Sequence, residues 1–139
     1  MLSRVLTLTA ACFLPSFLVA QDDGAKVSLE LNALTPTDTA CMASFIATNT
    51  SGQDIESAIY EVVLFDTDGG VDRLTLLDFG TLPSGRPRVR QFGLGNLACD
   101  DLGQVLINGA QTCTVAGAAS GVCADQLKVS SRTEVEVTG

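Results

Sequence analysis

Residues 55–79 read IESAIYEVVLFDTDGGVDRLTLLDF, and this stretch carries the strongest structural signal of the 139-residue chain. In the run 55–65 the two alternating sets of side chains are both largely apolar, with Glu61 the main exception. Such a strand lies centrally in a sheet or is covered on both sides. An Asp-Gly-Gly triplet follows, and it supplies the positive φ angles that a tight reversal requires. We therefore predict a hairpin between strands at 55–65 and 71–79.

Five further segments have strand-like patterns and are separated by turns rich in Gly, Pro, Asn and Asp. The last of them is the most regular, because apolar or small residues alternate with charged or polar ones along its whole length. Helical spacing is nowhere sustained over three turns. Seven short strands predict an all-β, immunoglobulin-like two-sheet sandwich, with a small closed β-barrel as the alternative. The five segments are 26–34, 41–49, 87–92, 104–108 and 127–137.

The N-terminus has the pattern of an export signal. A short start containing Arg4 precedes an uncharged apolar run of 16 residues, which ends beside Asp22 and Asp23. A membrane-spanning helix needs about 20 apolar residues, so a cleaved peptide is favoured over an anchor. We expect residues 1–20 to be a cleaved signal peptide and 21–139 to form a single domain. The protein would then be periplasmic or secreted, with no membrane insertion after cleavage.

Four cysteines follow the predicted signal: Cys41, Cys99, Cys113 and Cys123. An even set in an exported chain predicts two disulfides. Cys113 and Cys123 bracket a loop rich in Ala and Gly, so a bridge between them would close a local loop and leave Cys41 to pair with Cys99. No C-x-x-C spacing occurs, which favours structural over redox-active cysteines.

Composition excludes several functional classes. The chain has no His and no Trp, so nucleophile–imidazole pairs, His-ligated metals and the commonest general base near neutral pH are absent. Loss of Arg4 with the signal leaves 7 basic and 16 acidic residues, a net charge of −9. Nucleic acids and anionic membranes need clustered positive charge, so neither is an expected partner. We expect no cofactor.

Arg86, Arg88 and Arg90 recur at every second residue and would share one face of a strand. One hypothesis is a docking stripe for a partner that bears carboxylates or phosphates. The alternative, which we favour, is that the arginines protect an exposed sheet edge from self-pairing and form weak surface ion pairs.

Asp66, Asp68 and Asp72 cluster at the predicted hairpin tip and are weak candidates for a calcium site. The match to a helix-flanked calcium loop fails, because Gly70 and Leu77 stand where that loop has ligands. Turn formation explains the same residues without a metal ion, so we predict none.

Several segments between residues 41 and 92 resemble small exported immunoglobulin-like domains of the FxLYD kind, although Leu64-Phe65-Asp66 lacks the tyrosine of that signature. The whole layout, including Val105-Leu106-Ile107-Asn108-Gly109-Ala110 and Val129-Ser130-Ser131-Arg132-Thr133, is also similar to uncharacterised exported alphaproteobacterial proteins. The resemblance implies a β-sandwich in a bacterial periplasm and carries over no catalytic residue. The segments are Phe45-Ile46-Ala47-Thr48-Asn49, Glu61-Val62-Val63-Leu64-Phe65-Asp66, Gly70, Leu82-Pro83-Ser84-Gly85 and Arg90-Gln91-Phe92.

These observations predict a non-enzymatic interaction or binding module whose partner is an unidentified envelope protein. One alternative is an enzyme, or an enzyme inhibitor, that acts through the acidic loops or through the loop between Cys113 and Cys123. A third hypothesis is an envelope component that binds a second copy of itself.

Overall fold

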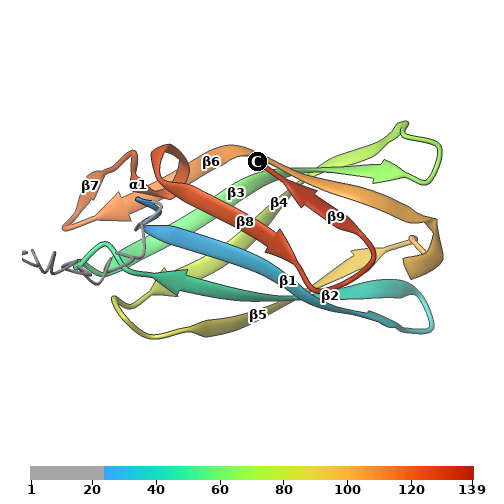
Figure 1. Cartoon of the computed structure of the whole chain (residues 1–139), viewed down its shortest axis with the longest axis horizontal. Helices are drawn as coiled ribbons and strands as arrows, with labels where there is room; N and C mark the ends of the chain where they lie inside the picture. Colours follow the sequence, from blue (N-terminus) through green and yellow to red (C-terminus); the bar gives the residue numbers. More distant parts are fainter. Residues whose placement is uncertain (1–23) are drawn as a thin grey trace, which may run out of the picture.

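The computed structural model describes residues 24–139, and nearly all of its regular structure is β-strand (Figure 1). Two short helices interrupt the strands, the 3-10 turn η1 (Cys99–Asp101) and α1 (Val122–Asp125). In this part of the chain no helix has the length and apolar character needed to cross a membrane. The predicted signal peptide, residues 1–20, lies outside the described residues. The strands are β1 (Val27–Pro36), β2 (Ala40–Asn49), β3 (Ile55–Asp66), β4 (Val71–Leu82), β5 (Arg88–Gly95), β6 (Leu102–Val115), β7 (Ala118–Ala119), β8 (Leu127–Ser131) and β9 (Glu136–Thr138).

The strands form two sheets that pack face to face (Figure 1). One sheet has the order β5-β2-β1-β8, and the other has the order β4-β3-β6-β7 with β9 also paired to β6. Both sheets are mixed, because β8 runs parallel to β1 and β9 runs parallel to β6. The prediction of a two-sheet, immunoglobulin-like sandwich is confirmed, and the sheets do not close into a barrel.

The predicted hairpin is confirmed as β3 and β4, which pair antiparallel along most of their length. The Asp66 carboxylate closes the turn by accepting hydrogen bonds from the backbone N–H groups of Asp68 (3.0 Å) and Gly70 (2.9 Å). Gly69 has a φ of +84°, a backbone conformation that residues other than glycine rarely adopt. The turn chemistry of the sequence therefore sets the register of the hairpin.

The C-terminal run predicted as one strand at 127–137 is instead two strands in different sheets. The segment leaves β8 beside β1 and reaches β9 beside β6, so it crosses between the two layers (Figure 1). The alternation nevertheless persists through the crossing, since Val135 and Val137 are buried and Glu134 and Glu136 are exposed. The alternation of apolar and polar residues indicates which side chains face the core. Because both sheets face the same core, the alternation does not indicate which sheet a residue belongs to.

Strand β6 is longer than the predicted segment at 104–108. It continues to Val115 and pairs with β3 along its length, with register shifts near Gly109 and Ala110. These small residues hide the alternation in the sequence. At its start, a Cβ on Gly103 would lie only 2.7 Å from the carbonyl carbon of Asp66, so β6 needs glycine where it passes the end of β3.

Both predicted disulfides are confirmed. Cys41 in β2 is bonded to Cys99 in η1, with Cα atoms 4.8 Å apart. Cys113 in β6 is bonded to Cys123 in α1, with Cα atoms 6.0 Å apart. The first bridge joins the two sheets through the connection between β5 and β6, and the second holds the β7 loop and α1 against β6.

Four aromatic rings from four strands meet between the two sheets, and three of them are fully buried while Phe92 is partly buried. Phe79 lies 5.5 Å from Tyr60, 5.6 Å from Phe45 and 5.0 Å from Phe92, measured between ring centroids. The contacts to Tyr60 and Phe45 are edge-to-face, the arrangement that the aromatic quadrupole favours. Because these rings come from β2, β3, β4 and β5, the cluster fixes the two sheets against each other.

A buried polar residue joins three segments at one end of the sandwich. The Asn49 side chain is fully buried, and its Nδ2 donates to the carbonyl oxygens of Gln53 (2.7 Å) and Leu82 (2.8 Å). Its Oδ1 accepts from the backbone N–H of Ser51 at 3.0 Å. The amide thus satisfies backbone groups that would otherwise be unpaired in the interior.

Tyr60 connects the core to the second disulfide. Its phenol donates a hydrogen bond to the carbonyl oxygen of Cys123 at 2.9 Å. Burial raises the pKa of this phenol well above its ordinary value. Because the folded state retains the proton more strongly than the unfolded state, the contribution of the phenol to stability is complete below about pH 10 and is lost as pH rises.

We therefore expect Tyr60→Phe to lower the free energy of unfolding by about 1 to 2 kcal/mol at neutral pH, through loss of the buried hydrogen bond. Urea unfolding at neutral pH and above about pH 10 measures this effect. Wild-type stability should fall across that interval more steeply than the stability of the variant. Tyr60 is the sole tyrosine of the chain, so phenolate absorbance reports it alone, and ionisation at the ordinary pKa in folded protein would contradict the burial argument.

Candidate functional site

The arginine series is split by the fold. Arg86 lies in the turn before β5, whereas Arg88 and Arg90 lie opposite the buried residues Ala47 and Phe45 of β2. Residues directly opposite each other point to the same face, so the side chains of Arg88 and Arg90 start from the inner side of the sheet. The side chains of Arg88 and Arg90 therefore face the gap between the two sheets, where the edge strands β4 and β5 lie.

Arg90 spans this gap. Its Nε donates to the carbonyl oxygen of Phe79 at 2.7 Å and its Nη2 donates to that of Thr81 at 3.0 Å, both in edge strand β4. Arg73 makes the reciprocal contact from β4, since its Nη1 donates to the carbonyl oxygen of Gly95 in β5 at 2.6 Å. Charge-assisted hydrogen bonds to backbone carbonyls thus join the two edge strands.

These contacts fit the edge-protection interpretation of the arginines, because carbonyls that Arg90 occupies cannot pair with another strand. Arg88 is half-buried and donates to the carbonyl oxygen of Pro87 at 3.1 Å, which leaves Arg86 as the exposed member of the three. A docking role for the series stays a prediction. Arg73, which no spacing in the sequence indicates, joins the same two edge strands from the β4 side.

The three aspartates at the hairpin tip have separate roles. Asp66 uses its carboxylate to close the turn, as described above, and Asp72 forms an ion pair with Arg73 at 2.7 Å. Asp68 is exposed in the turn. Residues 24–139 contain no group of three or more Cys, Asp or Glu side chains arranged to hold a metal ion.

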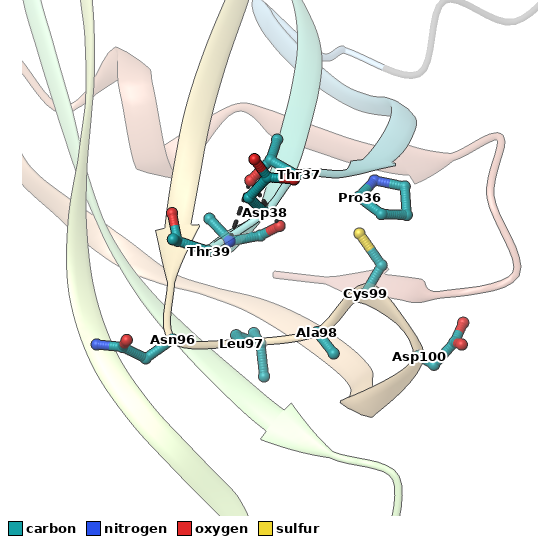
Figure 2. A pocket seen from close by; sticks show the side chains of 10 residues that line it. Pro36, Thr37, Asp38, Thr39, Asn96, Leu97, Ala98, Cys99 and Asp100 are labelled. Carbon is teal, nitrogen blue, oxygen red and sulfur yellow. Dashed lines mark hydrogen bonds between the residues drawn. The ribbon is translucent and has the colours of Figure 1, made fainter.

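One end of the sandwich carries two shallow depressions of about 480 and 600 Å³ that share Pro36, Cys99 and Asp100. The smaller one is lined by residues 36–40 and 96–100 (Figure 2). Thr37 holds its turn closed, because its Oγ1 accepts from the backbone N–H of Ala40 at 3.0 Å. In Figure 2 the side chain of Asp100 points away from this turn.

The linings of these depressions contain no Lys, Arg or Cys thiol, since Cys99 is in a disulfide. Their ionisable groups are the carboxylates of Asp38, Asp100 and Glu134. No nucleophile is paired with a base there, and no positive charge is present to bind an anion. The charged groups that line these depressions are therefore all acidic.

The outer face of the β4–β3–β6 sheet carries three of the four large hydrophobic side chains that are exposed in residues 24–139. The pairing register places outward-facing residues in rows: Val71 lies opposite Phe65, Leu74 opposite Val63, and Val63 opposite Leu106. Val71, Leu74 and Leu76 are 64, 56 and 48% exposed. We call this surface the outer apolar patch. It consists of Ile59, Phe65, Val71, Leu74, Leu76 and Leu106, together with Val63, which points to the same face but is itself buried.

The charges on and around the patch are all negative. Glu61 lies opposite Leu76 within it, Asp78 lies opposite Ile59, and Glu136 of β9 lies opposite Gln104. The basic residue of these strands is Arg73, which lies opposite the buried Leu64 and reaches across to β5. The outer face of the other sheet differs, because Val89 is its one large apolar side chain with high exposure.

The sequence contained a signal for this surface, namely the two apolar sets of the run 55–65. Two apolar sets predict a central or covered strand, and β3 is indeed central, between β4 and β6. The pattern does not indicate whether other residues cover the apolar side chains on the outer face of this strand. In the described structure Leu74 and Leu76 stay exposed to solvent.

Searches with this chain against protein-family models, curated proteins and solved structures found no match.

Proposed function

We propose that this chain is an exported, non-enzymatic binding module that recognises another protein of the cell envelope through its outer apolar patch. Export is supported by the signal-like N-terminus together with two disulfides, which persist in oxidising compartments. A non-enzymatic role is supported by the lack of histidine and by depressions without a paired nucleophile and base.

The observation that carries the proposal is the exposure of Val71, Leu74 and Leu76 side by side on one strand. Monomeric proteins seldom expose contiguous apolar surfaces of this kind unless the surface binds something. An exposed apolar strand at a sheet edge also promotes aggregation. Retaining three large aliphatic residues there is understandable if a partner covers them.

Site-specific photocrosslinking in cells that export the protein tests the proposal. A photoreactive residue at position 76 should give a discrete adduct, whereas the same residue at position 89 should not. Val89 is the matched control because it is an aliphatic residue of comparable exposure, 61%, on the opposite sheet. Adding Leu74→Ser should remove the adduct from position 76, because that residue is adjacent in the patch.

The single variant should keep the wild-type melting temperature, since exposed substitutions usually change stability by less than about 0.5 kcal/mol. Identical adducts from positions 76 and 89 would contradict the proposal. So would the absence of any adduct from position 76 in protein shown to be exported and oxidised.

A further inference from the structure

We infer that the occupant of the outer apolar patch is a basic, apolar surface of a different protein, in which aliphatic side chains are flanked by Lys or Arg. This inference rests on the proposed function and adds the chemistry of the partner. Its first support is the charge around the patch, because Glu61, Asp78 and Glu136 lie among or beside its residues and are all acidic.

Glu61 is central to this argument. It lies opposite Leu76 and next to Val63 along the outer side of β3, so a partner that covers the aliphatic residues must also cover its carboxylate. Asn108 donates one hydrogen bond to Glu61 Oε1 at 2.6 Å, which holds the side chain over β6. Covering a carboxylate without a positive partner is costly, so a Lys or Arg of the partner is required near it.

A second copy of the chain is a poor occupant. A symmetric dimer uses the same patch on both copies, so it would bring the acidic groups Glu61, Asp78 and Glu136 of one copy toward the same acidic surface of the other, with no basic group to pair with them. Each copy without the predicted signal also carries a net charge of −9, which adds long-range repulsion. Electrostatic complementarity therefore favours a partner of the opposite charge.

The arginine contacts determine how the partner approaches. Pairing of a new strand with the whole edge of β4 would need the carbonyl oxygens of Phe79 and Thr81, and Arg90 already occupies both. Edge pairing along this part of β4 is thus blocked, whereas the face that carries Leu74 and Leu76 is open. The partner packs on the face of the sheet.

Three soluble peptides test this inference. All contain the same alternating Leu and Val residues, and the intervening positions are Lys, Ser or Glu. We expect the Lys peptide to bind wild-type protein about tenfold more tightly than the Ser peptide, and the Glu peptide not to bind, by fluorescence anisotropy at low salt. Raising the salt from about 50 to about 300 mM should reduce the difference.

A matched pair of variants separates the patch from the overall charge. Glu61→Gln should weaken binding of the Lys peptide about threefold, whereas Glu30→Gln should leave it unchanged. Glu30 is a suitable control because it is a half-buried glutamate of the other sheet that also accepts a hydrogen bond from an asparagine, Asn32, at 3.0 Å. Leu74→Ser/Leu76→Ser should abolish binding while the melting temperature is retained.

Equal affinities for the Lys and Ser peptides would overturn the inference, and so would equal losses from Glu61→Gln and Glu30→Gln. Sedimentation velocity gives a third decisive outcome. A wild-type dimer that Leu74→Ser/Leu76→Ser dissociates would show that a second copy is the occupant. If the crosslink at position 76 forms without any preference for the Lys peptide, the inference fails and the proposed function stands. If the crosslink is absent, the proposed function itself fails.

Discussion

Replacing Cys41 and Cys99 together by alanine is expected to lower the free energy of unfolding by about 4 kcal/mol. The bond joins residues 58 positions apart and therefore restricts the unfolded chain strongly. Net stabilities of single domains are about 5 to 15 kcal/mol, so this loss would leave the protein close to its unfolding threshold. Equilibrium unfolding in urea, with wild type and variant compared at equal pH, measures the difference directly.

The second disulfide supplies the control. Cys113 and Cys123 are 10 positions apart, and the same loop-entropy relation gives about 3 kcal/mol for the corresponding double variant. The long-range pair should therefore be the more costly one to remove. The opposite order would show that packing around α1, including the Tyr60 hydrogen bond, outweighs chain entropy.

Both disulfides could be predicted from the sequence because a local physical rule applied. Only three pairings of four cysteines exist, and a short loop rich in Ala and Gly favours closure by its own ends. The β3–β4 hairpin was predictable for a similar reason, since its Asp-Gly-Gly turn sets the backbone reversal within a few residues.

Long-range arrangements were harder to predict. The alternation of the C-terminal run identified its buried residues, yet the run divides between β8 and β9 in different sheets. In one of its two parallel pairings, Val27 pairs with Leu127, which lies 100 positions later in the chain. Such pairing depends on the packing of both layers and leaves no trace in local periodicity.

The same limit applies to the candidate site. Spacing showed that Arg88 and Arg90 share a face, but only the register opposite Ala47 and Phe45 shows that this face is the inner one. A shift of one residue would reverse it. Likewise, apolar residues on both sides of β3 predict a buried or central strand. Only the assembled sheet shows that no other element of the described chain packs over the outer apolar residues.

The role of Asn49 could not be predicted for a different reason, because asparagine serves both in exposed turns and as a buried hydrogen-bonding group. In the sequence it begins a polar stretch that ends a strand, and asparagine is common in turns. In the structure it is fully buried and donates to two carbonyl oxygens from different segments. Neither composition nor residue spacing distinguishes these two uses of asparagine, since only the tertiary fold brings the carbonyl of Leu82 to Asn49.

The buried amide of Asn49 can be replaced by a carboxylate of nearly the same shape. Asn49→Asp should lower the free energy of unfolding by about 3 to 5 kcal/mol at neutral pH, the usual cost of an uncompensated buried charge. The change keeps the shape of the side chain but replaces the Nδ2 donor by a negative oxygen. That oxygen would face the carbonyls of Gln53 and Leu82, now 2.7 and 2.8 Å from Nδ2, and repel both.

The pH dependence distinguishes this cause from a packing defect. Burial raises the pKa of the new carboxyl group, so the folded variant binds a proton more readily than the unfolded chain. The penalty is therefore smallest below about pH 4, the ordinary pKa of aspartate, and grows as pH rises toward neutrality. Urea unfolding across this range should show variant and wild type converging at low pH.

The control is Asn96→Asp, at an exposed position with a φ of 53° that aspartate also tolerates. Its free energy of unfolding should stay within about 0.5 kcal/mol of wild type at neutral pH. A penalty at Asn49 that does not change with pH would mean that the two carbonyl contacts are not what the amide contributes.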